Sequence, residues 1–267
     1  TSDTTTKLLS VPVVSERTIM KTVQVRNITL GEGRPKICVP IVGQTKDDIL
    51  LEAGTFARIP VDVVEWRVDW FEDVFDTDKV LDVAKDLQTV LKDTPILFTF
   101  RTAKEGGEKA ISNEAYKALN MAVAKSGYVD LIDVEAFTGE EIVKSMIQDA
   151  HSYGVKVVYH SCGSIVEAIP LLIEAGVDVI HPIQALAAGM DPANLKDKFD
   201  GKISFCGVDT QDLLPNGTPE QVAAKVKELR TYFPTGLIVS PSHEGLQPDV
   251  PPSNIKALFD EATKIYE

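Results

Sequence analysis

The sequence predicts an α/β protein, a single (β/α)8 (TIM) barrel with an N-terminal β-hairpin cap. Short β-branched apolar runs alternate with helix-like segments, and there are eight such units along the chain. No glycine-rich nucleotide loop follows any of these runs. A doubly wound open sheet is the alternative, but evenly spaced units without that loop favour a closed barrel.

The predicted strands are short and largely apolar, as expected of parallel strands that are buried on both faces. They cover Lys36–Val42, Val61–Asp69, Pro95–Arg101, Leu131–Phe137, Val155–Cys162, Val177–Gln184, Lys202–Asp209 and Gly236–His243. The segments between them are typical of helices, for example SNEAYKALNMAVAKSG, in which either Ser112 or Asn113 could be the N-cap. Before the first strand, KTVQVRNITLGEG alternates in polarity, which predicts a hairpin across the N-terminal end of the barrel.

The composition limits the class of partner. The chain has 267 residues and a formal net charge of −13, so we expect neither nucleic acid nor an anionic membrane as a partner. A local basic pocket would still accept a small anionic molecule. The three cysteines form no disulfide pattern, which predicts a reducing, cytoplasmic setting. Residues 1–19 are polar and are expected to form a leader outside the single barrel of residues 20–267.

Charged residues gather where the second, third and fourth predicted strands end. They are Glu65, Arg67, Arg101, Glu105, Asp133 and Glu135. Active-site residues of (β/α)8 barrels lie at this end of the strands. Acids and arginines that converge there could bind a carboxylate substrate, with arginine making a bidentate contact. A structural ion-pair ring inside the barrel is the alternative.

Several of these residues lie in motifs that resemble a known family. The segments KTVQVRNITLGEGRPKICVPIVG, EWRVD, ILFTFRTAKEGGE and LIDVEAFTGEE, between residues 20 and 158, resemble type I 3-dehydroquinate dehydratase. That family is a (β/α)8 barrel that dehydrates 3-dehydroquinate through a Schiff base on a lysine. The resemblance implies that Glu65, Arg67 and Arg101 bind the substrate and that Glu105 supports the catalytic histidine. Such dehydratases are often dimers, so we expect a monomer or a homodimer.

The family's chemistry also needs a histidine that ends the fifth strand and a lysine on the sixth. In KVVYHSCGS, His160 lies two positions before the family's His-Asp-Phe motif, and Cys162 stands at the histidine position. In GVDVIHPIQ there is no lysine, and Val177 or a neighbour takes its place. Lys104 lies in a loop near the mouth. A Schiff base cannot form without an amine, so we expect no native dehydratase activity.

The rest of the chain resembles a different family. The segments HSCGSIVEAIPLLIEAGVDVIHPIQ, GMDPANLKDKFDGKISFCGVDTQDLLPNGTPEQV and LIVSPSHEGLQPDVPPSNIKALF resemble the uroporphyrinogen decarboxylase superfamily, in particular its branch with cobamide-dependent methyltransferases. In that branch a His-x-Cys pair and a later Cys or His bind zinc. The resemblance implies His160, Cys162 and His243 as zinc ligands, whereas Gln184 stands where some relatives place an acidic ligand. Imidazole and thiolate are good zinc ligands.

The remaining histidines and cysteines fit structural roles. Cys206 is expected to be buried filler. His181 precedes a proline and is expected to be a core or hydrogen-bonding residue, and His151 is expected on a helix surface. The alternative to the zinc site is a His-x-Cys pair that only packs the barrel mouth.

The two resemblances meet near Val157–Ser161, with residues 20–158 dehydratase-like and residues 159–267 decarboxylase-like. This pattern predicts an engineered half-barrel chimera, a folded scaffold without efficient native catalysis. It would keep Glu105 and His160 as catalytic remnants, bind an anion or zinc at the mouth, and require no cofactor. Two alternatives are a 3-dehydroquinate dehydratase-type lyase that compensates for the missing lysine and a zinc-dependent methyltransferase-like enzyme. Tetrapyrrole decarboxylation is not expected, because the groups it needs come from the replaced half.

Overall fold

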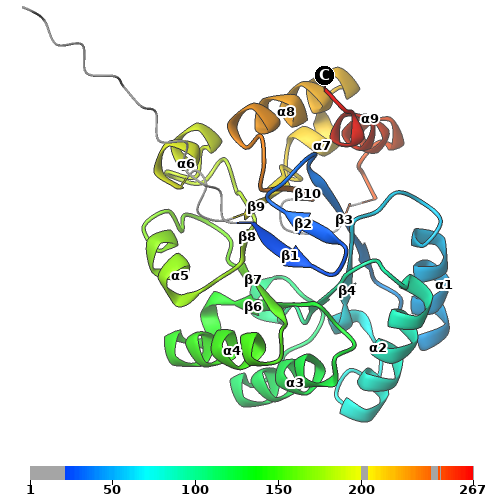
Figure 1. Ribbon diagram of the computed structural model, residues 1–267. Coiled ribbons are helices and arrows are strands. Elements are labelled where there is room, and N and C mark those ends of the chain that lie inside the picture. Colours follow the sequence, from blue (N-terminus) through cyan, green and yellow to red (C-terminus); the bar gives the residue numbers. More distant parts are fainter. Residues whose placement is uncertain (1–21, 200–203, 242–245, 247, 267) are drawn as a thin grey trace, which may run out of the picture.

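The structure is a computed structural model that describes residues 22–199, 204–241, 246 and 248–266. Within these residues, eight parallel strands close into a barrel in the order β10-β3-β4-β5-β6-β7-β8-β9 (Figure 1). They are β3 (Lys36–Ile41), β4 (Val63–Arg67), β5 (Ile96–Thr99), β6 (Leu131–Glu135), β7 (Lys156–His160), β8 (Val179–His181), β9 (Ser204–Val208) and β10 (Leu237–Pro241). Each strand lies inside its predicted range, and the predicted fold class is confirmed. The predicted leader, residues 1–19, lies outside the described residues.

Helices surround the strands as an outer ring (Figure 1). They are α1 (Lys46–Phe56), α2 (Thr77–Leu91), α3 (Asn113–Ser126), α4 (Glu140–Ser152), α5 (Ile169–Ala175), α6 (Pro192–Phe199), α7 (Leu213–Asn216), α8 (Pro219–Tyr232) and α9 (Pro252–Thr263). Ser112 is the N-cap of α3, because its side chain accepts a hydrogen bond from the backbone N–H of Ala115. Among the described residues, none of the helices has the length and apolar character needed to cross a membrane.

The predicted hairpin is present and covers the N-terminal end of the barrel. Strands β1 (Val23–Val25) and β2 (Ile28–Leu30) pair antiparallel, and Figure 1 shows them across the barrel opening. Their buried side chains pack against inward-facing residues of the barrel strands. These residues are Val63, Leu97, Leu131, Val158, Val179 and Ile238. The hairpin therefore closes this end of the barrel with an apolar plug.

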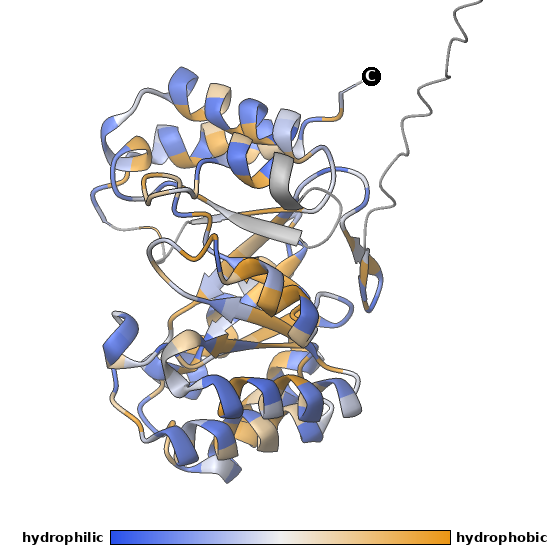
Figure 2. Ribbon diagram, turned by 90° about the vertical axis from the view of Figure 1, so that its left-hand side faces the viewer, coloured by the Kyte–Doolittle hydropathy of each residue, from blue (hydrophilic) through white to orange (hydrophobic). Residues whose placement is uncertain are grey.

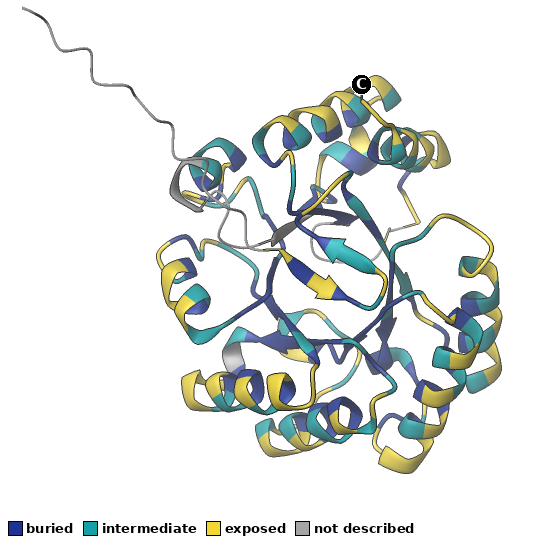
Figure 3. Cartoon of the chain, in the orientation of Figure 1, coloured by how far each residue is buried: buried dark blue, intermediate teal, exposed yellow. Residues whose placement is uncertain are grey.

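The larger core lies between the strands and the helices. Figure 3 shows buried residues along the strands and on the inner faces of the helices, and Figure 2 shows the same strands to be hydrophobic. Trp66 is fully buried in this layer, and its ring packs edge-on against Phe98 with the ring centroids 5.6 Å apart. Because side chains alternate along a strand, Glu65 and Arg67 then face the barrel interior. The packing of Trp66 between the strands and the helices therefore determines which polar side chains of β4 point into the barrel.

Candidate functional site

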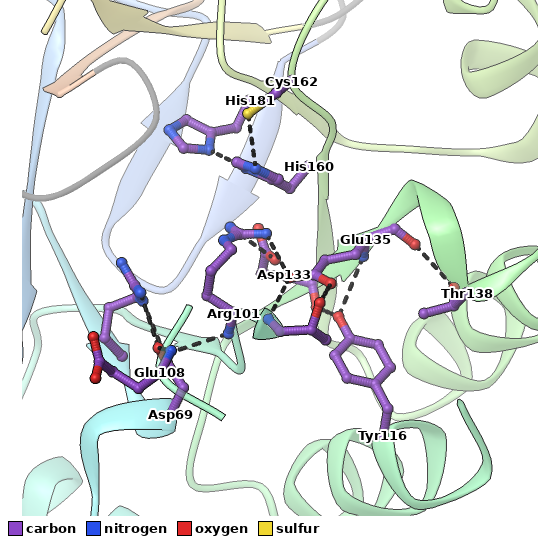
Figure 4. Close-up of polar contacts among 12 residues, drawn as sticks. Asp69, Arg101, Glu108, Tyr116, Asp133, Glu135, Thr138, His160, Cys162 and His181 are labelled. Carbon is purple, nitrogen blue, oxygen red and sulfur yellow. Dashed lines mark hydrogen bonds and ion pairs between the residues drawn. The ribbon is translucent and has the colours of Figure 1, made fainter. Parts of the chain in front are cut away.

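Polar side chains gather at the C-terminal end of the barrel. Short 3-10 helices follow three of the strands there: η1 (Val68–Trp70) after β4, η2 (Ala103–Glu105) after β5 and η3 (Ala136–Thr138) after β6. Polar residues at the ends of these strands contact one another at the mouth, as Figure 4 shows for Arg101, Asp133 and Glu135. This is the end at which barrel enzymes carry their active sites.

Arg67 is held by a carboxylate that the sequence did not single out. Its Nε and Nη2 donate to Oδ1 and Oδ2 of Asp69, both at 2.9 Å. Asp69 is fully buried and also accepts hydrogen bonds from the backbone N–H groups of Arg101 and Glu108. Arg67 borders a cavity of about 520 Å³ together with Trp70 and other residues. Asp69 therefore orients Arg67 at the edge of an open cavity.

Arg101 lies in a buried network with two acids. Its Nη1 donates to Glu135 Oε1 at 2.9 Å, and its Nη2 lies 3.1 Å from Asp133 Oδ1. Glu135 also accepts hydrogen bonds from the backbone N–H and the hydroxyl of Thr102. All three charged side chains are buried. Glu65 does not join them by a hydrogen bond in the described part of the chain, and it borders a small interior cavity of about 30 Å³ instead.

Tyr116 anchors this network to α3. Its hydroxyl donates to the backbone carbonyl of Asp133 at 2.9 Å and accepts from the backbone N–H of Glu135 at 3.2 Å. Burial, with the nearby carboxylates adding to it, raises the pKa of Tyr116 well above its ordinary value. The phenol is therefore a neutral structural donor. Sequence reasoning missed it because its partner is a backbone group on the following strand.

Asp133 is the acid whose protonation is most affected by the barrel interior. Burial raises the pKa of Asp133 to about 7; Arg101 opposes this shift, and Glu135 and Glu65 add to it. In the unfolded chain the same carboxyl titrates near its ordinary pKa of about 3.9. The folded state therefore binds more protons than the unfolded state between these two values.

This difference predicts the pH dependence of stability. The free energy of unfolding should fall as the pH rises from about 4 to about 7, because the folded state must lose a proton that the unfolded state has already lost. An Asp133→Asn variant should lose this component of the slope. Chemical denaturation at about pH 5 and about pH 8 would measure it. An unchanged slope in Asp133→Asn would contradict the assignment, and the exposed Asp82→Asn is the control.

His160 lies above this network at the end of β7. It is fully buried. Its Nδ1 is 2.9 Å from Nδ1 of His181, and its Nε2 is 3.7 Å from Sγ of Cys162 (Figure 4). The strand register pairs Glu135 with His160 and His160 with His181, so these three residues lie at one level of neighbouring strands. The register of β7 and β8 brings the two imidazoles together, and the sequence alone does not give that register.

Glu105 lies next to His160. One donor atom each from Glu105, His160 and Cys162 lie within 4.8 Å of one another, as do donor atoms of Asp133, His160 and His181. Burial raises the pKa of Glu105, and the nearby Glu135 adds to the shift. His160 thus stands beside the acid that the resemblance assigned to the catalytic histidine. The structure places both His160 and Cys162 in this cluster, so the two-position offset does not remove His160 from the site.

The other predicted site residues are placed as follows. Gln184 accepts a hydrogen bond from the backbone N–H of Gly163 at 2.5 Å, so it orders the loop after β7. His151 contacts Asp178 at 2.7 Å on the outside of the barrel. His243 and the side chain of Cys206 lie outside the described residues. Strand β8, with the sequence Val-Ile-His, carries no lysine, and Lys104 lies exposed in η2.

Fold and site together define a (β/α)8 barrel with a cluster of titratable groups at its C-terminal mouth. The family described as type I 3-dehydroquinase matches residues 37–164, and uroporphyrinogen decarboxylase (URO-D) matches residues 118–265. The solved type I 3-dehydroquinate dehydratase of Clostridium difficile is 32% identical, with a TM-score of 0.72, over 91% of this chain and 97% of its own. The chain therefore belongs to the type I 3-dehydroquinate dehydratase family, and residues 118–265 also belong to the uroporphyrinogen decarboxylase family.

Curated relatives agree over the first part of the chain. The 3-dehydroquinate dehydratase of Bacillus licheniformis is 51% identical over 138 residues, which are 52% of this chain and 54% of the relative. That of Listeria monocytogenes serotype 4a is 54% identical over 139 residues, which are 52% of this chain and 55% of the relative. The chain thus spans about half the length of the curated relatives it matches.

These findings correct one prediction. The expectation of an engineered scaffold without efficient native catalysis is wrong. The curated relatives, which share about 50% sequence identity with this chain over the matched residues, and the solved structural neighbour are 3-dehydroquinate dehydratases. Those relatives are lyases, so the chain is placed among enzymes. The absence of a lysine from β8 is a difference at one position, whereas the similarity to dehydratases extends over more than 130 residues. The two family matches overlap over residues 118–164 rather than meeting at one point.

Proposed function

We propose that this chain is a lyase of the 3-dehydroquinate dehydratase type, which removes water from a cyclic hydroxy ketone that carries a carboxylate. The observation that carries the proposal is the placement of His160. It ends β7 at the catalytic mouth, beside Glu105 and His181, in a chain whose relatives are dehydratases. A buried imidazole that another imidazole orients is well suited to general acid–base catalysis.

The proposed reaction is an elimination. A base removes a proton from the carbon next to the ketone, the carbon–carbon double bond forms, and the carbon–oxygen bond to the leaving hydroxyl breaks. The hydroxyl takes up a proton and departs as water. We assign the base role to His160, because His181 holds its Nδ1 and its Nε2 faces the Cys162 side of the cluster. The same imidazole, once protonated, can return the proton to the leaving hydroxyl.

The missing lysine changes how charge is stabilised. With His181 rather than lysine at the end of β8, we propose that the proton is removed from the ketone itself instead of an iminium ion. Negative charge then develops on the ketone oxygen and needs a nearby hydrogen-bond donor. His181 is the group at the end of this strand that can supply an N–H. The proposed route therefore uses two imidazoles where the family uses an imidazole and an amine.

Substrate binding is proposed for Glu65, Arg67 and Arg101, and Arg67 is proposed to make the direct contact with the substrate. Asp69 engages Nε and Nη2 of Arg67 and leaves Nη1 for a substrate carboxylate at the cavity that Arg67 borders. Arg101 is paired with Asp133 and Glu135 and is buried. Its proposed contribution is therefore indirect, through the carboxylates that it holds in place at the end of β6, rather than through a direct contact.

The test is turnover of 3-dehydroquinate by the purified chain, followed through the ultraviolet absorption of the conjugated product. We expect product formation, and we expect no mass increase after borohydride reduction in the presence of substrate. A mass increase would show an imine on one of the lysines and would overturn the ketone route. Product formation no faster than in a protein-free blank would overturn the lyase assignment itself.

A further inference from the structure

Another cavity lies at the N-terminal end of the barrel, away from the catalytic mouth. It has a volume of about 720 Å³ and is bordered by the turn between β2 and β3, by α8 and by the residues after α9. The two helices pack side by side (Figure 1). The lining includes the cations Arg34, Lys227 and Arg230, and none of the described lining residues is an acid. The chain carries a formal net charge of −13, so this cleft is a local positive site on an acidic protein.

The helix α8 brings two of these cations to one face. Lys227, Arg230 and Thr231 are spaced by three and four positions, so their side chains lie on the same side of the helix. Val226 and Leu229 are buried in the core and fix the rotation of the helix. Lys227 is exposed and makes no ion pair within the part of the chain that the structure describes. Its ammonium group is therefore available to a ligand.

Arg230 is held in place by the end of α9. Its Nη1 donates to the backbone carbonyls of Glu261 and Lys264 at 2.9 Å and 2.8 Å. Its guanidinium lies over the ring of Tyr266, 4.1 Å from the ring centroid. These contacts leave Nη2 and Nε for an acceptor in the cleft. Because the side chain is already ordered, it loses little conformational entropy when it binds one.

Arg34 is oriented in a similar way in the turn before β3. Its Nη1 and Nη2 donate to the two carboxylate oxygens of Asp62 at 2.8 Å and 3.0 Å, which leaves Nε. Burial lowers the pKa of Arg230, Glu261 opposes this shift, and the nearby Arg34 adds to it. The two guanidinium groups therefore repel each other, and an anion bound between them would reduce the repulsion.

We propose that this cleft binds a phosphate ester that carries a flat, unsaturated ring. Three cations suit a dianionic group, and both guanidinium and ammonium groups bind phosphate. Ile265 and Tyr266, which are 83% and 42% exposed, provide an apolar surface for the ring. A cavity of about 720 Å³ is in the size range of sites for small organic molecules rather than for a single inorganic ion. The proposal does not depend on the dehydratase assignment.

The experiment is titration of the full chain with phenyl phosphate by isothermal calorimetry at low ionic strength. We expect one molecule per chain, with an affinity about 5-fold weaker in Lys227→Met and at least about 10-fold weaker in Arg230→Met. Inorganic phosphate and benzyl alcohol, which each present one part of the ligand, should bind at least about 10-fold more weakly. The matched control is Lys225→Met on the same helix, a lysine that pairs with Glu228 and should be dispensable.

The location of binding is tested by a variant at the other end of the barrel. Arg67→Met should leave the affinity for phenyl phosphate unchanged, because Arg67 lies at the catalytic mouth. Binding that Arg67→Met weakens and that Lys227→Met does not would place the phosphate at the mouth and overturn the proposal. The absence of saturable binding would overturn it as well. Far-ultraviolet circular dichroism would check that Arg230→Met folds, and Lys227→Met, at an exposed position, gives an independent reading. No turnover is measured, so a lack of dehydration would not affect this outcome.

Discussion

Replacing His160 with glutamine is expected to lower kcat for dehydration by roughly 10²–10⁴-fold, the usual contribution of a general acid–base residue. Glutamine keeps a polar side chain of similar reach but cannot remove a proton at neutral pH. KM should change by less than about 3-fold, because the proposed carboxylate contact is made by Arg67 rather than by His160. Steady-state kinetics with 3-dehydroquinate would separate the two constants.

The control for this variant is His151→Gln on α4, whose side chain contacts Asp178 outside the barrel. It should retain the unmodified kcat. A thermal melt of both variants would check that the buried glutamine has not unfolded the chain. A folded His160→Gln with unchanged kcat would remove the base role from this residue.

Replacing Arg101 with methionine is expected to lower the free energy of unfolding by about 3–5 kcal/mol, the typical effect of breaking a buried ion pair by removing one partner. The variant leaves Asp133 and Glu135 buried without the guanidinium that lies 3.1 Å and 2.9 Å from them. The loss should be larger at about pH 8 than at about pH 5, because the raised pKa of about 7 leaves Asp133 protonated at the lower pH. Urea denaturation at both values would measure it.

A surface pair provides the comparison for Arg101. Lys46 contacts Asp82 and Asp86 on the outer helices, where solvent screens the charges. Lys46→Met should therefore change the free energy of unfolding by less than about 1 kcal/mol. If Arg101→Met lowered the free energy of unfolding no more than Lys46→Met does, the prediction that the buried ion pairs of Arg101 stabilise the fold would be contradicted.

The fold could be predicted from the sequence because its determinants are local. Each barrel strand is a short apolar run, so the periodicity of hydrophobic residues located β3 to β10 without any knowledge of contacts. The hairpin was equally visible, since Val23 and Val25 alternate with polar neighbours before a glycine turn. The predicted strands extend beyond the observed strand ends. The same kinds of residue continue past those ends, and after β4 and β6 they form 3-10 helices instead of strand.

The site was less predictable because its contacts join distant segments. Asp69 was missed although it lies next to Arg67 in sequence, since nothing local shows that its carboxylate would also accept the backbone N–H of Glu108, 39 positions later. The contact between His160 and His181 depends on the register of β7 and β8. A one-residue shift in that register would turn one ring away from the other. Residue types can be read from a sequence, but register at a strand end cannot.

The apolar plug made by Val23, Val25 and Leu30 has a kinetic consequence. In the described part of the chain the hairpin covers one end of the barrel, so we expect small molecules to enter and leave the proposed site at the opposite end. Substrate and product then use one passage and occupy overlapping positions, so they exclude each other. Accumulated product should slow turnover in a manner that more substrate reverses, the behaviour of a competitive inhibitor.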